Sequence, residues 1–531
     1  MYSIINKLAK FLGNAPIVGD WLNGYLINRF AKAIPPRPRP LAMDADYPTW
    51  RGLTDRRISG RHLPPAPEFN QNLPPIDDVT ALFKQTEDKR ANDTSLLFPF
   101  FAQWFTDSFL RTQWKPAAEQ DFAHNESNHE IDLCQIYGTN EERTAMLRSF
   151  SDGLLKSQMI DGEEYPVHLF EEVNGELRVK PEFDGLYTDA NFQRVFTFAS
   201  DAHKRNCYAV GLEHGNSTMG NTVMNVLFLR QHNRIAKALK ETYGDKPGWD
   251  DERLFQTARN INIVILLNIV ISDYIVHISP VDFPLRAVPG MAEKENWYRT
   301  NWIAVEFALL YRWHSFIPAT VRFAGREEPS SALRQNNRWV LSAGIDTVCR
   351  DASSQKAGKL GLGNTPDFIT DVSKLSLHMA RTCRLQPYNA YRRYYSLSEK
   401  TSFTDLTADK QMAQKLENLY GSIDKLEWFV GLFAEDYGKA NMMGDLLTTM
   451  VANDAFTQAL TNPLLSKYVY NADTFTELGL DIINKTKTLA DVIVNNTGIT
   501  NKDEVSFVAR PYHGPGPQTA KPTEKVTEEV N

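Results

Sequence analysis

Several features that would assign a chain to a particular class of protein are scarce in this sequence. Only four cysteines occur among its 531 residues, and they lie far apart, at Cys134, Cys207, Cys349 and Cys383. This spacing fits neither a zinc site nor a disulfide scaffold, so we expect buried free thiols. No run reaches the roughly 20 apolar residues that a membrane-spanning helix needs. No signal peptide with an apolar core and a small-residue cleavage site is recognisable either.

An excess of positive charge is also missing. Lys and Arg number 58 against 65 Asp and Glu, a net charge of −7, which lacks the basic surface that a nucleic-acid partner would require. Hydrophobic residues make up 42% and charged residues 23%, a balance typical of soluble proteins. A chain of this length buries a large core and has room to enclose a cofactor. The most apolar run, 261–271, contains Asn262 and Asn268 and predicts a buried core helix.

Helical periodicity dominates the chain and predicts a mainly α fold, with one large helical domain over 91–510. Strand-like alternation is weak, with candidates at 166–179 and 338–341. The segments with helical periodicity or helix-forming composition are 96–112, 140–156, 219–240, 252–279, 299–315, 366–384, 409–420 and 424–436.

The two ends of the chain differ from this body. Residues 1–33 form two short amphipathic segments with basic flanks and apolar faces that include Phe11 and Trp21. Such segments suit a membrane interface, but they would equally well pack on the protein's own core. Residues 34–90 begin with a proline-rich stretch and are expected to run as an extended linker along the body, and residues 511–531 to form a disordered tail.

The histidines point to a site with a single imidazole ligand. None of the 11 histidines has the HExxH or HxH spacing of a zinc site, whereas haem iron needs only one protein ligand. The segment from Glu306 to Pro318 places Tyr311 and His314 three residues apart, and a helix would put them on one face. An imidazole on iron would then have an oxidisable phenol one turn away. A histidine satisfied within the core is the alternative.

This segment resembles the cyclooxygenase and fatty-acid dioxygenase branch of the animal haem peroxidase superfamily, whose hallmark is Tyr-x-x-His after Glu-Phe. The resemblance covers about residue 10 to about residue 509 and implies a helical haem peroxidase domain preceded by short amphipathic helices. Further similar stretches follow in the same order, at 100–112, 131–155, 228–239, 254–264, 384–397 and 416–432.

The resemblance implies roles for individual residues. His314 becomes the proximal ligand of a haem b iron, and Tyr311 the tyrosine that carries a radical to the substrate. Tyr274 matches the tyrosine that hydrogen-bonds this radical site, with a core phenol as the alternative, and Gln103 matches the distal glutamine above the iron. The N-terminal helices are similar to a monotopic membrane-binding motif. They imply peripheral membrane attachment, a cytoplasmic location being the alternative, and the resemblance allows a homodimer.

Contacts to a fatty-acid substrate are also implied. Arg29 lies near the arginine that pairs with the fatty-acid carboxylate, although the match needs a gap of a residue or two, and a plain surface arginine is the alternative. Ser279 is implied beside the substrate. Ala455 stands where animal cyclooxygenases have the serine near the substrate, and Val281 where they have a tyrosine at the channel mouth.

The sequence departs from the family at the distal histidine. Asp107 occupies that position, and no histidine lies within 96–112. Peroxide chemistry needs a distal group that takes a proton and returns it; a histidine with a pKa of ~6.5 does both, and an exposed aspartate at ~3.9 does so poorly. Burial would raise the pKa of Asp107, and Gln103 at i−4 would share its face. Phe429 replaces the tyrosine behind the proximal histidine, which removes a usual partner of the imidazole.

The sequence is therefore compatible with three functions. The first is a haem-dependent dioxygenase that uses peroxide and molecular oxygen to oxygenate a fatty acid through a radical at Tyr311, with weakened peroxidase activity because of Asp107. The second is a haem peroxidase or peroxygenase of small reductants in which Asp107 is the acid–base. The third is a haem-binding protein that has lost catalysis.

Overall fold

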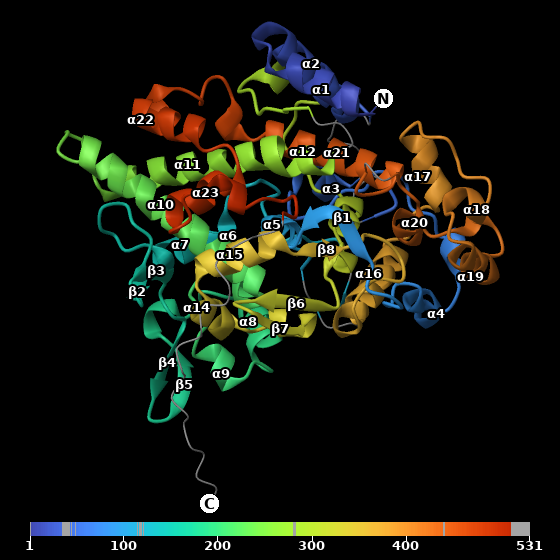
Figure 1. Cartoon of the computed structure of the whole chain (residues 1–531), viewed down its shortest axis with the longest axis horizontal. Coiled ribbons are helices and arrows are strands. Elements are labelled where there is room, and N and C mark those ends of the chain that lie inside the picture. The colour runs from blue at the N-terminus through green and yellow to red at the C-terminus, as the bar shows by residue number, and fades with distance from the viewer. Residues whose placement is uncertain are drawn as a thin grey trace, which may run out of the picture.

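The computed structural model describes residues 2–33, 43, 45–47, 49–113, 115, 119–120, 122–279, 283–438 and 441–510. Within these ranges the chain is mainly helical, as predicted, with a few short strand pairs (Figure 1). Most of the proline-rich stretch 34–48, all of the tail 511–531, and Val281 lie outside the described residues.

Two long helices form the centre of the body. Helix α10 (Met219–Tyr243) packs against α11 (Asp251–Ile269), and α22 (Ala472–Lys485) covers the other side of α11. Both central helices begin at a capping side chain, Thr218 for α10 and Asp250 for α11, which accepts a hydrogen bond from a backbone amide of the first turn. These helices supply the frame on which the shorter elements are placed.

Helix α11 continues without interruption through a π-helical segment, Val270–Tyr274, into α12 (Ile275–Ile278). The combined helix Asp251–Ile278 is long and apolar enough to span a membrane, but 78% of its most apolar window is buried inside the protein. The run 261–271 is therefore a core helix, as predicted. The π-helical segment ends on Tyr274, which is fully buried.

Helix α5 (Leu97–Thr106) lies against α10 at very close range. A Cβ added to Gly220 would sit 2.7 Å from the Phe100 ring, so only glycine allows the two helices to come this close. Nine of the ten α5 residues are buried, and Asp107 forms the C-terminal cap of the helix. The close packing brings the end of α5 beside the first turn of α10.

The strands form four separate antiparallel pairs rather than a sheet. They are β1 (Arg90–Ser95) with β8 (Lys356–Gly358), β2 (Ser157–Ile160) with β3 (Glu163–Pro166), β4 (Phe170–Val173) with β5 (Glu176–Val179), and β6 (Thr320–Phe323) with β7 (Arg326–Pro329). The last three pairs are hairpins, and each has a two-residue turn with two positive φ angles that ends in glycine, such as Asn174 (φ 54) and Gly175 (φ 83).

The remaining helices surround this centre. They are α3 (Trp50–Thr54), α4 (Ile76–Ala81), α6 (Cys134–Tyr137), α7 (Glu141–Leu147), α8 (Asp189–Phe196), α9 (Asp201–Lys204), α13 (Val305–Leu310), α14 (Asn337–Ala343), α15 (Ile345–Ser354), α16 (Thr370–Thr382), α17 (Tyr388–Tyr394), α18 (Phe403–Leu406), α19 (Lys410–Tyr420), α20 (Trp428–Ala434), α21 (Asp445–Leu460) and α23 (Leu489–Asn496). The four cysteines are buried and free, as expected.

Three local predictions are wrong. The strand candidate 338–341 lies inside α14, because the Asn336 side chain accepts a hydrogen bond from the Trp339 amide and caps a helix there. The helix predicted over 140–156 ends at Leu147, where Arg148 turns into an extended bridge with Leu155. The helix predicted over 299–315 is confined to α13, which ends at Leu310.

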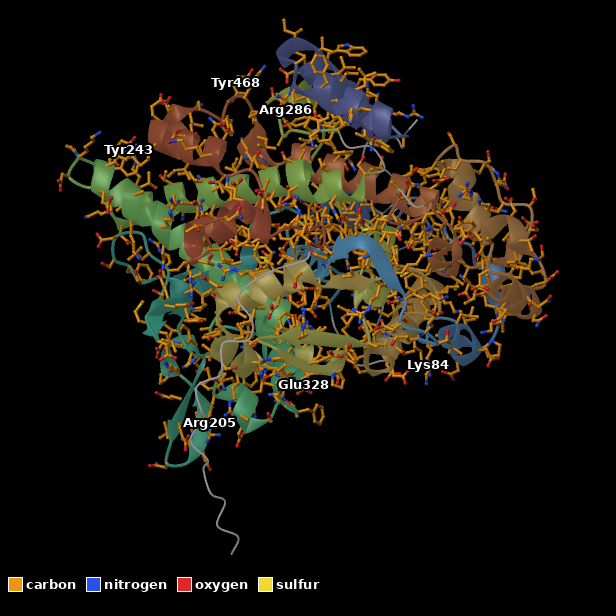
Figure 2. All side chains as sticks on the ribbon, viewed as in Figure 1. Lys84, Arg205, Tyr243, Arg286, Glu328 and Tyr468 are labelled. Atoms are coloured by element: carbon orange, nitrogen blue, oxygen red, sulfur yellow. The ribbon has the colours of Figure 1, made fainter. Side chains whose placement is uncertain are left out.

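The N-terminal segment forms the two predicted helices, α1 (Tyr2–Asn14) and α2 (Pro16–Ala31), at one edge of the molecule (Figure 1). Helix α2 packs on α21, with Ile27 fully buried. Arg286, labelled in Figure 2, ties both helices to the body because its guanidinium pairs with Asp20 at 2.9 Å and donates to the Gly13 carbonyl. One side of the pair therefore packs on the core.

Candidate active site

A cavity of about 550 Å³ opens between the end of α5, the turn before α10, the segment after α13, and α16. Its walls bring together residues that are far apart in the sequence. Those that carry chemistry are Gln103, Asp107, Arg111, Glu126, Arg194, Glu213, His214, Thr218, Tyr311, Arg312, His314 and Arg334. The cavity thus holds the predicted pairs Gln103–Asp107 and Tyr311–His314 together.

Tyr311 and His314 reach this cavity from a broken helix. Tyr311 is the C-terminal cap of α13, with φ −85° and ψ 10°, and His314 opens a 3-10 turn, His314–Phe316. The expectation of one helical face is therefore wrong, although both side chains still line the same space. The turn is pinned by Ser315, whose carbonyl accepts from the Asn364 side chain at 3.3 Å and whose hydroxyl accepts from the Gly361 amide at 3.1 Å.

The imidazole of His314 is held in its neutral form. Burial lowers the pKa of His314 to about 3, and the charge of Arg312 acts in the same direction. A neutral imidazole is the form that ligates a metal. Beside it, Nε of Arg312 and Nε1 of Trp313 are enclosed with no hydrogen-bond partner in the described part of the chain. Two buried donors therefore remain available to a bound group that carries acceptor oxygens.

Tyr311 and Tyr274 form the expected phenol pair. Tyr274 stacks on Phe98 with a centroid distance of 5.1 Å, and Tyr311 packs on Trp313 at 4.7 Å. Burial raises the pKa of each phenol. The Tyr311 hydroxyl raises the pKa of Tyr274 further, whereas the Tyr274 hydroxyl opposes the rise at Tyr311. Neither hydroxyl makes a hydrogen bond of standard geometry within the described residues. The two phenols are thus neighbours; Tyr274 is fully buried, whereas Tyr311 is partly buried and lines the cavity.

Asp107 is the C-terminal cap of α5, and its side chain lines the cavity. Its Oδ2 accepts a hydrogen bond from Asn221 Nδ2 at 3.1 Å. Burial raises the pKa of Asp107 to about 6, against the opposing effects of the Asn221 hydrogen bond and the charges of Arg111 and Arg312. The rise that the sequence suggested is present. One turn earlier, Gln103 lines the same cavity and its Oε1 accepts from Thr218 Oγ1 at 3.4 Å.

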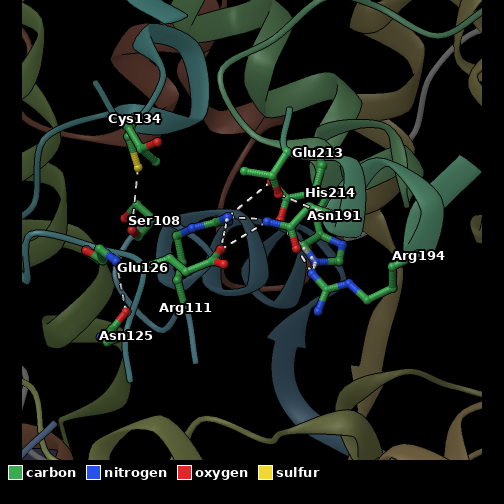
Figure 3. Close-up of polar contacts among 12 residues, drawn as sticks. Ser108, Arg111, Asn125, Glu126, Cys134, Asn191, Arg194, Glu213 and His214 are labelled. Atoms are coloured by element: carbon green, nitrogen blue, oxygen red, sulfur yellow. Dashed lines mark hydrogen bonds and ion pairs between the residues drawn. The ribbon is translucent and has the colours of Figure 1, made fainter. Parts of the chain in front are cut away.

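A cluster of charges that sequence reasoning missed lines the same cavity as Asp107. Figure 3 shows its members Arg111, Glu126, Arg194, Glu213 and His214. Arg111 donates to both carboxylate oxygens of the buried Glu213, at 2.9 and 3.1 Å. Arg194 donates to His214 Nε2 at 2.5 Å. These residues come from α5's C-terminal extension, α8 and the turn Glu213–Asn216. No spacing rule joins them, because only the tertiary fold brings them together.

The predicted substrate contacts lie elsewhere. Arg29 is exposed on α2, Ser279 is half-buried after α12, and Ala455 is buried in α21; none of these described residues lines the cavity. The residue before Ala455 is closer to the chemistry, because the charge of Asp454 raises the pKa of Tyr311. Asp454 also pairs with the buried His62 at 2.9 Å, a contact that the sequence did not indicate.

Phe429 is buried in α20 and stacks on Phe83 with a centroid distance of 5.6 Å. An apolar ring therefore occupies the position where the resemblance expected a tyrosine. Its effect on the His314 imidazole stays a prediction.

Residues 91–507 match the family model for animal haem peroxidase. The chain is 32% identical over 477 residues to prostaglandin G/H synthase 1 of Mus musculus, covering 87% of this chain and 74% of that protein. It is 30% identical over 511 residues to prostaglandin G/H synthase 2 of Bos taurus, covering 93% and 78%. Among solved structures, a fatty acid alpha-dioxygenase of Oryza sativa superposes with a TM-score of 0.71 at 17% identity, covering 96% of each chain.

Proposed function

The chain belongs to the animal haem peroxidase family and is a haem-dependent oxidoreductase, and we propose that it oxygenates a fatty acid through a radical on Tyr311. The observation that carries the proposal is that Tyr311 and His314 line one cavity, with Tyr274 beside Tyr311. Relatives named for prostaglandin synthesis and fatty-acid dioxygenation support the substrate class.

The residues of the cavity fit a haem b group. A space of about 550 Å³ lies in the range of cofactor pockets. His314 offers a neutral imidazole to the iron, and the enclosed donors of Arg312 and Trp313 would meet the carboxylates of the porphyrin. The bound group would supply the oxidising power that peroxide delivers, and the protein supplies position and a dry environment.

The phenol pair then determines where the radical resides. Tyr311 gives up one electron and its hydroxyl proton, and the resulting radical abstracts a hydrogen atom from the lipid. Molecular oxygen adds to the carbon radical, and the resulting peroxyl radical takes a hydrogen atom from the re-formed Tyr311 phenol, which yields the lipid hydroperoxide and restores the radical on Tyr311. The Tyr311 ring is positioned by packing on Phe307 and Trp313, and the Tyr274 hydroxyl is close enough to affect the pKa of Tyr311. On the peroxide side, a pKa of about 6 lets Asp107 both accept and return a proton near neutral pH.

Peroxidase or peroxygenase action on small reductants is the second candidate. It is favoured by the polar wall of the cavity, where Asp107 lies beside Arg111, Arg194 and Glu213. Such a wall suits small polar reductants as well as peroxide. This function predicts turnover without lipid, whereas the radical mechanism predicts oxygen uptake that depends on lipid.

Oxygen uptake by the haem-loaded Tyr311→Phe variant tests the first proposal. We expect an unchanged Soret band and no lipid-dependent uptake, since phenylalanine keeps the packing but cannot form the radical. Tyr437→Phe is the matched control, because its hydroxyl donates to the Leu360 carbonyl at 2.7 Å away from the cavity lining. Uptake at the wild-type rate in Tyr311→Phe would refute the radical.

Attachment to a membrane surface is proposed for the N-terminal helices. Their outer side carries exposed apolar residues: Phe11 is 74% exposed, Ile17 85% and Trp21 66%. Trp50 of α3 is 80% exposed as well. Exposed aromatic and aliphatic side chains on short helices at the edge of a protein favour binding to a lipid interface.

A further inference from the structure

His214 is a cavity residue for which the proposed function has no role. It lies beside Glu213 in the short turn Glu213–Asn216 that precedes α10 (Figure 3). Its side chain is 35% exposed and lines the cavity. The described histidines that line this cavity are His214 and His314. The position of His214 far along the chain from Asp107 kept it out of any motif.

The contact with Arg194 determines which ring nitrogen of His214 carries the proton. A guanidinium has only donors, so the hydrogen bond of 2.5 Å from Arg194 makes Nε2 an acceptor and places the hydrogen on Nδ1. Burial lowers the pKa of His214 to about 4; the Glu213 charge opposes this, and Arg194 and Arg111 reinforce it. The ring is therefore neutral at physiological pH.

The Nδ1–H group is left available to a ligand. Nδ1 takes part in none of the hydrogen bonds between described residues, and it is not among their enclosed polar atoms without a partner. A neutral imidazole thus presents an oriented donor at the surface of the cavity. Such a donor favours an oxygen atom on which negative charge develops.

One amide couples His214 to Asp107. Asn221 Nδ2 donates both to Asp107 Oδ2 at 3.1 Å and to the backbone carbonyl of His214 at 3.1 Å. Asn221 lies in the first turn of α10, where Thr218 caps the helix. The close packing of α5 on α10 at Gly220 keeps the end of α5 at this turn. The Asn221 hydrogen bonds and the packing of α5 on α10 therefore fix the position of Asp107 relative to the turn that carries His214.

We propose that Asp107 and His214 divide the work of the missing distal histidine, a proposal that rests on the proposed haem function. The peroxide O–H proton passes to the Asp107 carboxylate, and His214 Nδ1–H donates a hydrogen bond to the peroxide oxygen that becomes anionic. When the O–O bond breaks, Asp107 returns the proton to the departing oxygen, which leaves as water; a bound haem would supply the two electrons that this oxygen takes up and would accept the other oxygen atom. A single histidine usually takes both roles.

Anion binding to the ferric holoenzyme separates the two roles without turnover. Fluoride is already deprotonated at neutral pH and reports on the donor, whereas hydrogen cyanide must lose a proton and reports on the base. We expect His214→Ala to weaken fluoride binding on the order of 10-fold. This is less than the roughly 100-fold or greater effect on rate that follows the loss of one donor to a developing oxyanion. Asp107→Asn should slow cyanide association and should not weaken fluoride binding. His203→Ala, a histidine outside the cavity lining, is the control.

The outcomes are distinguishable. His214→Gln retains an N–H donor and should recover much of the fluoride affinity. His214→Leu fills the same space without a donor, so it decides the matter if His214→Ala loses haem. Fluoride affinity at the wild-type value in His214→Ala or His214→Leu, with an intact Soret band, would overturn the division of roles alone. Failure of the wild-type chain to bind haem would instead overturn the proposed function.

Discussion

Replacing Asp107 with asparagine should stabilise the protein while it impairs peroxide chemistry. The change removes one charge, keeps the shape of the side chain and leaves an oxygen to accept from Asn221. Burial raises the pKa of this carboxyl from 3.8 to about 6, so its ionised form is disfavoured in the folded state. Each pKa unit corresponds to about 1.4 kcal/mol, which gives a cost of about 3 kcal/mol. Because Asp107 lines the cavity, where water reaches it and reduces this cost, we expect Asp107→Asn to raise the free energy of unfolding by about 1–3 kcal/mol.

The sign of the pH dependence follows from the direction of the change in pKa. A carboxyl with a raised pKa in the folded state binds its proton more tightly there, so its contribution to stability falls as pH rises from 3.8 to about 6. The free energy of unfolding of Asp107→Asn should therefore exceed that of the wild type at pH 7. The difference should disappear near pH 4, where the wild-type carboxyl is protonated in the folded state.

Chemical denaturation of the two proteins at several pH values between 4 and 7 measures this difference. Asp481→Asn is the matched control, because that side chain is 51% exposed and pairs with Lys485 at the surface; we expect a change within about 0.5 kcal/mol. An Asp107→Asn variant that is less stable than the wild type at pH 7, or a difference that does not depend on pH, would refute the reasoning.

Two further predictions concern the charge cluster and the N-terminal helices. Glu213→Gln leaves Arg111 without its buried partner and should lower the free energy of unfolding by about 3–5 kcal/mol in denaturation experiments. Burial raises the pKa of Glu213, but the charge and hydrogen bond of Arg111, together with His214 and a backbone amide, outweigh burial and lower the pKa to about 2. This stabilisation is therefore present above pH 4.5 and is lost as pH falls toward 2. Trp21→Ser should reduce co-sedimentation with anionic vesicles several-fold, whereas Phe198→Ser, 91% exposed elsewhere on the surface, should not; equal binding of both variants would contradict the membrane proposal.

The long buried helices were predictable because their sequences carry strong signals. The run 261–271 is apolar apart from Asn262 and Asn268, and Thr218 and Asp250 provide the side chains that start α10 and α11. The short strand pairs and the break after Leu310 were harder to predict. Tyr311 leaves helical geometry at a point where the next turn is held by long-range hydrogen bonds to Asn364, and local periodicity contains no information about such bonds.

Only those residues of the candidate site that match the family motif could be predicted from the sequence. Tyr311, His314, Gln103 and Asp107 were identified from the sequence and line one cavity. His214 was not, because it lies in a turn with no repeating pattern and reaches Asp107 only through the packing of α5 on α10. Arg29, Ser279 and Ala455 stay predictions, since the cavity lining does not include them.

The central claim is that His314 in this cavity holds the haem iron, and haem titration of the wild-type chain beside His314→Ala tests it most directly. The account predicts a saturable Soret band in the wild type, and a shifted or absent band in the variant although its far-ultraviolet circular dichroism is unchanged. An unaltered Soret band and affinity in His314→Ala would contradict the claim.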